Sequence, residues 1–180
     1  MKLFIASDLH GSALYCRKML QAAEEARADR ILLLGDLLYH GPRNDLPEEY
    51  DTKAVTALLN GVKDRLLCVR GNCDAEVDQM VLEFPIMAEY SLLHLDGCTI
   101  YAAHGHLAGP DDPPPLQKGD VLLCGHIHLP VERPCGDYIY LNPGSVSLPK
   151  DGTPHSYMLL ENGVFSWHDL LTGETFQPLG

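Results

Sequence analysis

Seven residues of types that bind metal ions occur in five short motifs along the chain. The motifs read FIASDLHG, ILLLGDL, LLCVRGNCD, IYAAHGH and VLLCGHIH, and their polar residues stand at the ends of apolar, strand-like runs. The candidate ligands are Asp8, His10, Asp36, Asn72, His104, His126 and His128. Sites in α/β proteins form where strands end. Two carboxylates, one amide and four imidazoles are enough to hold two divalent cations with shared ligands, which predicts an enzyme that hydrolyses phosphate esters.

The spacing of the histidines and carboxylates favours convergence on shared ions. Asp8 and His10, like His126 and His128, stand two residues apart, and alternate residues of an extended segment face the same side. The two carboxylate oxygens of Asp36 can bridge two cations, which a single imidazole cannot do. Each motif alone has an ordinary explanation, such as a turn or a helix cap. Their combination predicts metal binding.

Composition limits the class of protein. A chain of 180 residues with 46% hydrophobic residues is predicted to form one domain, residues 1–180, with a sizeable core. No run approaches the roughly 18 apolar residues of a membrane span, and the N-terminal run lacks the features of a signal peptide. We therefore expect no association with membranes. Six cysteines without a CxxC pair predict free thiols and a reducing, cytoplasmic location.

The net charge of −12 argues against broad nucleic-acid binding, which needs a basic face. A phosphate ligand is still compatible with this charge. Two ligand carboxylates and two divalent cations would leave the cleft with a local charge of about +2, because bound ions dominate the field of a site. The charge therefore limits the size of the predicted partner, a small molecule, and does not exclude its phosphate.

The first half of the chain alternates strands and helices. Apolar runs predict strands at 2–7, 30–34 and 65–69, with helices at 12–28 and 52–60. Thr52 is predicted to cap the second helix, and Asn60-Gly61 to end it. Residues 37–51 are expected to form a long loop over the strand ends.

The second half is rich in strands. Asp96-Gly97 and Asn162-Gly163 each separate two apolar runs and predict hairpins. The proline-rich stretch 109–115 predicts a surface loop. The change in pattern without a linker predicts one domain with two sheets and helices on the outer faces. The apolar run 80–86 is interpreted either as a contact in a homo-oligomer or as a core strand.

The motif order DxH, GD, GN, HGH and GHxH resembles that of the calcineurin-like metallophosphoesterase superfamily. Within it, the short length and the run VRGNCDAEVD resemble the YfcE-type phosphodiesterases, as does LNPGS at 141–145. The resemblance covers Asp8 to His128 in motifs. It implies an α/β fold, a four-layer αββα sandwich of two mixed sheets flanked by helices.

The resemblance also implies how the ligands divide between two ions. Asp8, His10, Asp36 and His128 would surround one ion, and Asp36, Asn72, His104 and His126 the other. Asp36 would bridge, and a water between the ions would attack phosphorus. The resemblance favours two Mn²⁺ ions. Mixed nitrogen and oxygen ligands also suit Ni²⁺, Co²⁺, Fe²⁺ or Zn²⁺.

Cys73 departs from the superfamily pattern. Many members have a histidine after Gly-Asn, proposed to protonate the leaving oxygen. A thiol beside two cations should ionise more readily, and a thiolate has no proton to donate. We hypothesise that the enzyme lacks a strong general acid and prefers diesters with good leaving groups. The alternative is that Cys73 is a small filler at a turn. Asp74 is predicted to cap the next short helix.

Three further residues, and one of the candidate ligands, are considered for other roles near the site. Asn72 and His106 are candidate substrate-binding residues, and His106 could instead orient a ligand. Arg70 is interpreted as a phosphate contact or as part of a scaffold salt bridge. His40 is expected to be an exposed loop residue.

The predicted function is therefore a dimetal phosphodiesterase acting on a small or accessible diester. One alternative is a phosphomonoesterase, including a protein phosphatase. The other is a non-catalytic, protein-binding scaffold on the same fold with a degraded metal site. All seven ligand positions carry competent side chains, which favours the enzyme.

Overall fold

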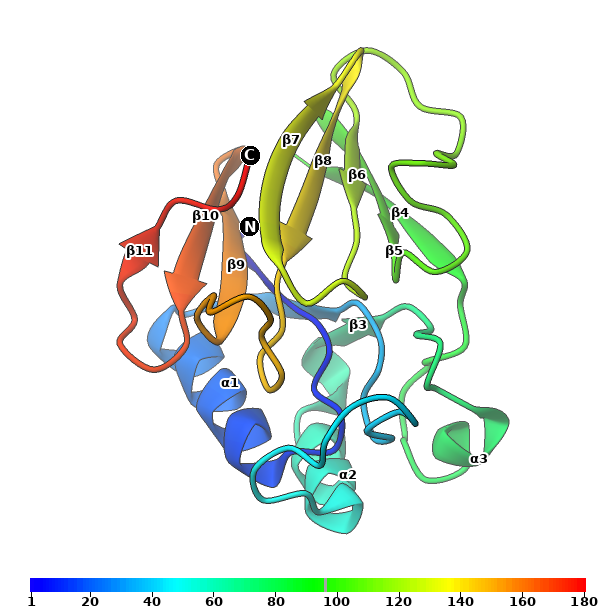
Figure 1. Ribbon diagram of the computed structural model, residues 1–180, viewed down its shortest axis with the longest axis vertical. Coiled ribbons are helices and arrows are strands. Elements are labelled where there is room, and N and C mark those ends of the chain that lie inside the picture. The colour runs from blue at the N-terminus through cyan, green and yellow to red at the C-terminus, as the bar shows by residue number, and fades with distance from the viewer. Residues whose placement is uncertain (96) are drawn as a thin grey trace.

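In the part of the chain that the structure describes, two β-sheets and three α-helices make up the fold (Figure 1). The computed structural model describes residues 1–95 and 97–180. The elements in chain order are β1 (Leu3–Ala6), α1 (Ala13–Glu25), β2 (Arg30–Leu33), α2 (Thr52–Asn60), a 3₁₀ turn η1 (Lys63–Arg65), β3 (Leu66–Cys68), α3 (Glu76–Gln79), β4 (Tyr90–Leu95), β5 (Cys98–Ala103), β6 (Val121–Leu123), β7 (Pro130–Cys135), β8 (Tyr138–Pro143), β9 (Ser156–Glu161), β10 (Val164–Asp169) and β11 (Thr175–Phe176).

The six-stranded sheet has the order β11-β10-β9-β1-β2-β3. Its strands β1, β2 and β3 run parallel, and β9, β10 and β11 extend the sheet by antiparallel pairing. Ala6 pairs with Leu33, and Leu33 pairs with Cys68. The carboxyl ends of the three parallel strands are therefore level, and the segments that follow them leave the sheet at one edge.

The five-stranded sheet has the order β4-β5-β6-β8-β7. Strands β5, β6 and β8 are parallel, and β4 and β7 pair antiparallel at the two edges. Ala102, Leu123 and Leu141 occupy matching positions on β5, β6 and β8. This sheet also presents the carboxyl ends of three parallel strands at one edge.

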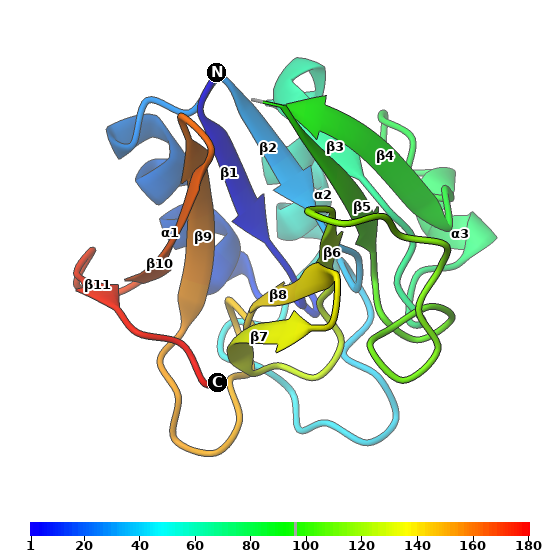
Figure 2. The ribbon, with the colours of Figure 1, turned by 90° about the horizontal axis from the view of Figure 1, so that it is seen from above.

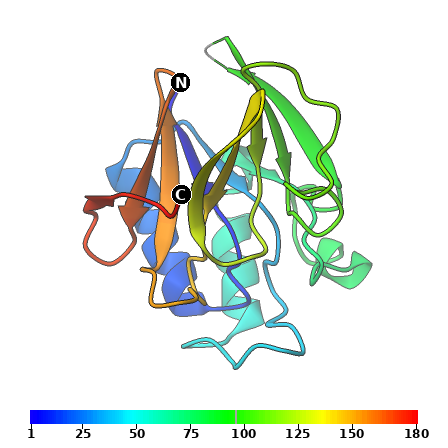
Figure 3. The ribbon, with the colours of Figure 1, turned by 45° about the horizontal axis from the view of Figure 1, so that its top comes forward.

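Alternating side chains of the parallel strands build two cores. Phe4 and Ala6 of β1 face α1 and α2, whereas Leu3 and Ile5 face the five-stranded sheet. Figures 2 and 3 show the helices on one face of the six-stranded sheet and the second sheet against its other face. A strand buried on both faces reads as a continuous apolar run, which is why β1 could be recognised from its sequence.

The outer face of the five-stranded sheet carries a smaller core. Leu122, Cys124 and Tyr140 pack there with Leu116, which belongs to the segment between β5 and β6. The predicted α/β sandwich of two mixed sheets is confirmed. Within the described ranges, the fourth layer of the sandwich is the segment between β5 and β6, which forms no helix. The prolines at 113–115 remove N–H groups that a helix needs.

Most predicted elements form where expected, including both hairpins. Leu95 pairs with Cys98 across the first turn, whose residue Asp96 lies outside the described residues. The prediction that Thr52 caps α2 was wrong. Thr52 is the first helical residue, and the Asp51 side chain accepts the hydrogen bond from the Ala54 N–H at 3.0 Å.

The apolar run 80–86 forms neither a helix nor a strand over most of its length. Leu82, Phe84 and Ile86 are buried in the helix-side core, whereas Met80 and Val81 are exposed. The run therefore contributes to the core as an irregular segment. The cysteines are free thiols, as predicted. No helix in the described part of the chain is long and apolar enough to cross a bilayer.

Candidate metal centre

The seven candidate ligands lie together between the two sheets, where the parallel strands end. Asp8 and His10 follow β1, Asp36 follows β2 and Asn72 follows β3, whereas His104 follows β5 and His126 and His128 follow β6. Five of them are almost fully buried, namely Asp8, His10, Asp36, His104 and His128. His126 is half-buried, and Asn72 is exposed.

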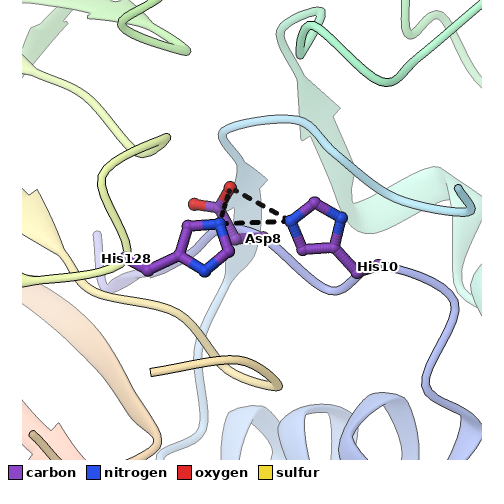
Figure 4. A group of neighbouring side chains, drawn as sticks. All are labelled: Asp8, His10 and His128. Carbon is purple, nitrogen blue, oxygen red and sulfur yellow. Dashed lines mark hydrogen bonds and ion pairs between the residues drawn. The ribbon is translucent and has the colours of Figure 1, made fainter. Parts of the chain in front are cut away.

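The first group of ligand atoms comes from Asp8, His10 and His128 (Figure 4). His128 Nε2 lies 3.2 Å from Asp8 Oδ1, and His10 Nε2 lies 3.6 Å from the same oxygen. The two Nε2 atoms are 3.2 Å apart. Three potential ligand atoms therefore surround one small volume.

The second group lies around Asp36. His104 Nε2 is 3.4 Å from Asp36 Oδ2 and 3.0 Å from Asn72 Oδ1. His126 Nδ1 is 3.3 Å from His104 Nε2. Asp36 Oδ2 is also 3.7 Å from His10 Nε2 of the first group. The Asp36 carboxylate thus stands between the two groups.

Hydrogen bonds to backbone carbonyls determine which ring nitrogens face the centre. The Nδ1 atoms of three histidines lie 2.6–2.9 Å from carbonyl oxygens, in the pairs His10 with Tyr39, His104 with Leu34 and His128 with Leu148. A carbonyl oxygen only accepts, so each Nδ1 donates, and Nε2 of the neutral ring presents a lone pair.

These lone pairs point at one another and at carboxylate oxygens. Asp8 Oδ1 is buried and has no hydrogen-bond partner. Lone pairs that face one another in a buried site have no donor, so a cation between them is needed to compensate their burial. Imidazole rings whose other nitrogen donates to a backbone carbonyl are typical of metal sites. The donor set fits divalent ions, and the two groups are consistent with a dimetal site.

Five of the seven residues have left-handed backbone conformations. Their φ angles lie between 50° and 71°, at Asp8, His10, Asp36, His126 and His128. Such φ values are uncommon for residues other than glycine and cost roughly 1–3 kcal/mol each. The extended geometry predicted for the two closely spaced pairs was therefore wrong. Asp8 and His10 nevertheless converge on one group, as predicted, whereas His126 and His128 belong to different groups, which is the division that the resemblance implied.

The glycines of the motifs permit close approach of the strand ends. A Cβ on Gly71 would lie 2.1 Å from Asp36 Oδ1, and one on Gly125 would lie 1.9 Å from Ser7 Oγ. A larger residue at either position would displace a carboxylate or the loop that carries it. Glycine before the ligand is therefore required by packing.

Asp74 ties two ligand-bearing loops together. Its carboxylate accepts backbone N–H bonds from Gly71 at 2.7 Å, Asp36 at 2.8 Å and Leu37 at 2.9 Å. The prediction that Asp74 caps the next helix was wrong, because α3 begins later and the Ala75 N–H is bound by Asp78 at 2.8 Å. The partners on the other loop are 37 and 38 residues away, so no local pattern indicated this role.

The LNPGS run and Ser147, two residues beyond it, support the same centre from the end of the five-stranded sheet. The hydroxyls of Ser145 and Ser147 donate to the Asp8 carbonyl at 2.8 and 2.9 Å. Asn142 Nδ2 donates to the Gly125 carbonyl at 2.7 Å. Sequence reasoning noted the run but assigned no role to these residues. The available signal was a set of small polar residues directly after an apolar strand.

Carboxylates and imidazoles shift one another's pKa values in this cluster. Burial lowers the pKa of His104, but its contact with Asp36 and the charge of Asp8 outweigh burial and raise it to about 9. Burial raises the pKa of Asp8, but His10 and His128 outweigh this effect and hold it well below its ordinary value. Metal binding must therefore displace a proton from His104.

We expect the chelator-treated protein to lose stability as the pH rises from about 6.5 to about 9. The pKa of His104 is 6.5 in the unfolded chain and about 9 in the folded protein. The stability that this difference contributes is therefore fully present below pH 6.5 and is lost as the pH rises through about 9. Both carboxylates, whose pKa values are lowered, stay ionised in this window. Thermal unfolding in EDTA at stepped pH measures the decline. A flat profile, or the same slope in a His104→Gln variant, would contradict the assignment.

Cys73 lies beside both groups. Its Sγ is within 4.8 Å of ligand atoms of His10 and Asp36, and its N–H donates to Asp36 Oδ1 at 2.8 Å. Burial and the charge of Asp36 raise the pKa of the thiol to about 12. Burial and Asp36 therefore oppose ionisation of the Cys73 thiol, which the nearby cations were expected to favour.

The other candidates occupy the margins of the site. His106 is half-buried beside His104, with ring centroids 5.3 Å apart, and its Nδ1 is buried without a hydrogen-bond partner. Arg70 Nε donates to the Asp74 carbonyl at 3.2 Å, a scaffold contact that is not the predicted salt bridge. His40 is half-buried with its ring edge-on to Tyr39 and Tyr50, so the prediction of an exposed residue was wrong.

A polar cleft of about 440 Å³ opens onto both groups. Its lining combines His10, Asp36, Asn72, Cys73, His126 and His128 with the cationic residues Arg43 and Lys150. Cations at the rim of a cleft attract an anionic ligand. The local charge of the cleft therefore differs from that of the acidic chain.

A family model described as the calcineurin-like phosphoesterase superfamily domain matches residues 1–163. The chain belongs to this superfamily. The resemblance in the motifs is thereby confirmed. The match includes every candidate ligand, from Asp8 to His128.

Two known proteins are similar to nearly the whole chain in sequence or in fold. The phosphodiesterase YfcE of Escherichia coli K12 is 48% identical over 166 residues, which cover 92% of this chain and 90% of that protein. A solved structure of YfcE, described as a phosphoesterase, superposes with a TM-score of 0.96 at 45% identity, covering 99% of this chain and 98% of the other. Vacuolar protein sorting 29 from Cryptosporidium parvum, with a TM-score of 0.65 at 20% identity over 97% and 94% of the chains, shares the fold.

Proposed function

We propose that the protein is a metal-dependent phosphodiesterase that hydrolyses a small or accessible phosphodiester with the help of two divalent ions. The observation that carries this proposal is the Asp36 carboxylate between two groups of imidazole lone pairs. The cationic rim of the cleft supports an anionic substrate. The relative that is 48% identical is named a phosphodiesterase.

The proposed ligands divide as the resemblance implied. Asp8, His10, Asp36 and His128 would hold one ion, and Asp36, Asn72, His104 and His126 the other. When bound, two such ions supply an acidified water and positive charge at the phosphoryl group. The chain contributes the positions of the ligands, because backbone carbonyls hold three imidazole rings from behind.

Side chains at the margin of the cleft are proposed to position the substrate. Asn72 is exposed at the mouth, and His106 has a buried Nδ1 that lacks a partner. Arg43 and Lys150 line the same cleft and would neutralise the charge of the phosphodiester.

We propose that the ions are Mn²⁺ and that the enzyme is a single cytoplasmic domain. Of the apolar run 80–86, only the exposed Met80 and Val81 support the proposed homo-oligomer, because the other apolar residues lie in the core.

A metal-reconstitution screen tests the function. Protein stripped with chelator is reloaded with single ions and assayed on bis(4-nitrophenyl) phosphate and on 4-nitrophenyl phosphate. We expect diester turnover to exceed monoester turnover at least about tenfold, or about 1.4 kcal/mol in activation free energy. Preference for the monoester would support a phosphomonoesterase. Bound metal without turnover of any ester would support the scaffold.

We expect the rate of diester hydrolysis to fall as the leaving phenol becomes less acidic. A thiol whose pKa is about 12 is a poor proton donor at neutral pH, and a thiolate would donate none, so the leaving oxygen departs without strong acid assistance. A series of aryl methyl phosphates with graded phenol pKa values measures the dependence. Cys73→Ser should leave the slope nearly unchanged. Rates that are independent of phenol pKa would disprove the idea.

A further inference from the structure

We infer that a second, apolar cavity beside the metal centre binds an apolar, ring-sized alcohol substituent of the phosphodiester. This inference rests on the proposed function and specifies the class of substrate. The cavity has a volume of about 650 Å³, within the roughly 300–1,000 Å³ typical of ligand pockets. It is larger than the polar cleft that holds the candidate ligands.

The lining of this second cavity is suited to an apolar ring. Tyr39 and Tyr50 provide aromatic faces, and Leu38, Val77 and Val81 provide aliphatic groups. Tyr39, Val77 and Val81 are 43%, 66% and 49% exposed, so a bound ring would cover apolar surface that now meets solvent. Burial of apolar surface favours binding by about 25 cal/mol per Å².

The second cavity and the polar cleft of the metal centre share a lining residue. Cys73 lines both the apolar cavity and the polar cleft, and its Sγ is within 4.8 Å of ligand atoms of His10 and Asp36. A Cβ on Gly41, which lines the polar cleft, would lie 3.2 Å from this sulfur, so the cleft reaches the Cys73 thiol closely. The Tyr39 carbonyl, which accepts from His10 Nδ1 at 2.9 Å, links the two sites from the other side.

The two cavities divide the substrate by polarity. A phosphodiester carries two alcohol substituents on one phosphorus, and a substituent on the Cys73 side reaches the second cavity directly. Arg43 and Lys150 line the cleft for the phosphoryl group, whereas the two charged residues that line the apolar cavity, Lys53 and Asp78, are of opposite sign and leave it without net charge. The substrate class is therefore a phosphodiester in which at least one alcohol bears an apolar ring.

Binding of two non-hydrolysable probes tests this assignment. Isothermal titration calorimetry on the Mn²⁺-loaded protein compares phenylphosphonate with methylphosphonate. We expect phenylphosphonate to bind about tenfold more tightly, equivalent to about 1.4 kcal/mol. Val77→Asp, which places a charge in the cavity, should remove the preference. Met80→Asp places the same charge on a neighbouring exposed residue that does not line the cavity, and should retain it.

A second pair of variants fills the cavity. Thr56 of α2 lines it and Ala57 does not, so Thr56→Phe should abolish the preference and Ala57→Phe should preserve it. Equal affinity of both probes for the wild-type protein would overturn the inference. The inference would also be overturned if Val77→Asp and Thr56→Phe kept the preference for phenylphosphonate. A third contradicting result is a change in the oligomeric state of Val77→Asp, measured by light scattering, while its probe preference stays the same.

Failure of the inference can be distinguished from failure of the proposed function. Hydrolysis of bis(4-nitrophenyl) phosphate by the wild-type protein is measured in parallel. If the protein hydrolyses the diester but binds phenylphosphonate no more tightly than methylphosphonate, only the proposed role of the apolar cavity is contradicted. Absence of hydrolysis with every metal removes the proposed function itself.

Discussion

Replacing Asp36 with asparagine is expected to lower kcat for diester hydrolysis by at least about 10³-fold, or about 4 kcal/mol in activation free energy. The Asp36 carboxylate lies 3.4 Å from His104 Nε2 and 3.7 Å from His10 Nε2, so it is the group shared by both clusters. An asparagine offers one neutral oxygen and cannot bridge two cations as a carboxylate does. Both ions would therefore be bound less tightly.

Metal content separates this explanation from a general loss of structure. Mass spectrometry of the native protein, or elemental analysis, should find fewer than two ions per Asp36→Asn chain. Asp45→Asn, in the same long loop but exposed, should retain both ions and activity. If Asp36→Asn keeps near-wild-type turnover and full metal content, the bridging role is refuted.

Replacing Asp74 with alanine is expected to lower the free energy of unfolding by about 3–5 kcal/mol. Three backbone N–H groups, of Asp36, Leu37 and Gly71, would lose their acceptor in a buried environment. Burial raises the pKa of Asp74, so its ionised form depends on these donors. The decrease corresponds to a fall in Tm on the order of 10 °C for a chain of this size.

Asp78→Ala is the matched control for Asp74. Asp78 lies in the same region but accepts one N–H, that of Ala75 at the start of α3, and its loss should cost about 1 kcal/mol. Chemical denaturation of both variants, with and without metal, gives the comparison. If both substitutions lower the free energy of unfolding by the same small amount, the hydrogen bonds of Asp74 do not hold the loops after β2 and β3 together.

Local patterns were sufficient to predict the elements and the candidate ligands. The continuous apolar run of β1 predicts a strand buried on both faces, and Leu3 and Phe4 do pack into opposite cores. The turn at Asn162-Gly163 joins β9 and β10 as its residue types require. Such features depend on neighbouring residues, and the sequence records them directly.

The geometry of the candidate site depends on contacts between distant residues. His126 and His128 are two residues apart, yet left-handed backbone at both positions sends them to different groups. The partners of Asp74 on the loop after β2 lie 37 and 38 residues away, and the carbonyl oxygen of Asp8 is bound by Ser145 and Ser147 from the other sheet. No local period encodes these contacts.

The sequence by itself determined which chemical groups are available and in what order, because strand periodicity and residue type are local properties. Only the tertiary structure decided how those groups face one another. The pKa of Cys73 follows from burial and from Asp36, 37 residues away, and the apolar cavity exists because the loop at 38–50 packs beside α2 and α3. Long-range packing and electrostatics produce these features, since they depend on which surfaces meet when the chain folds.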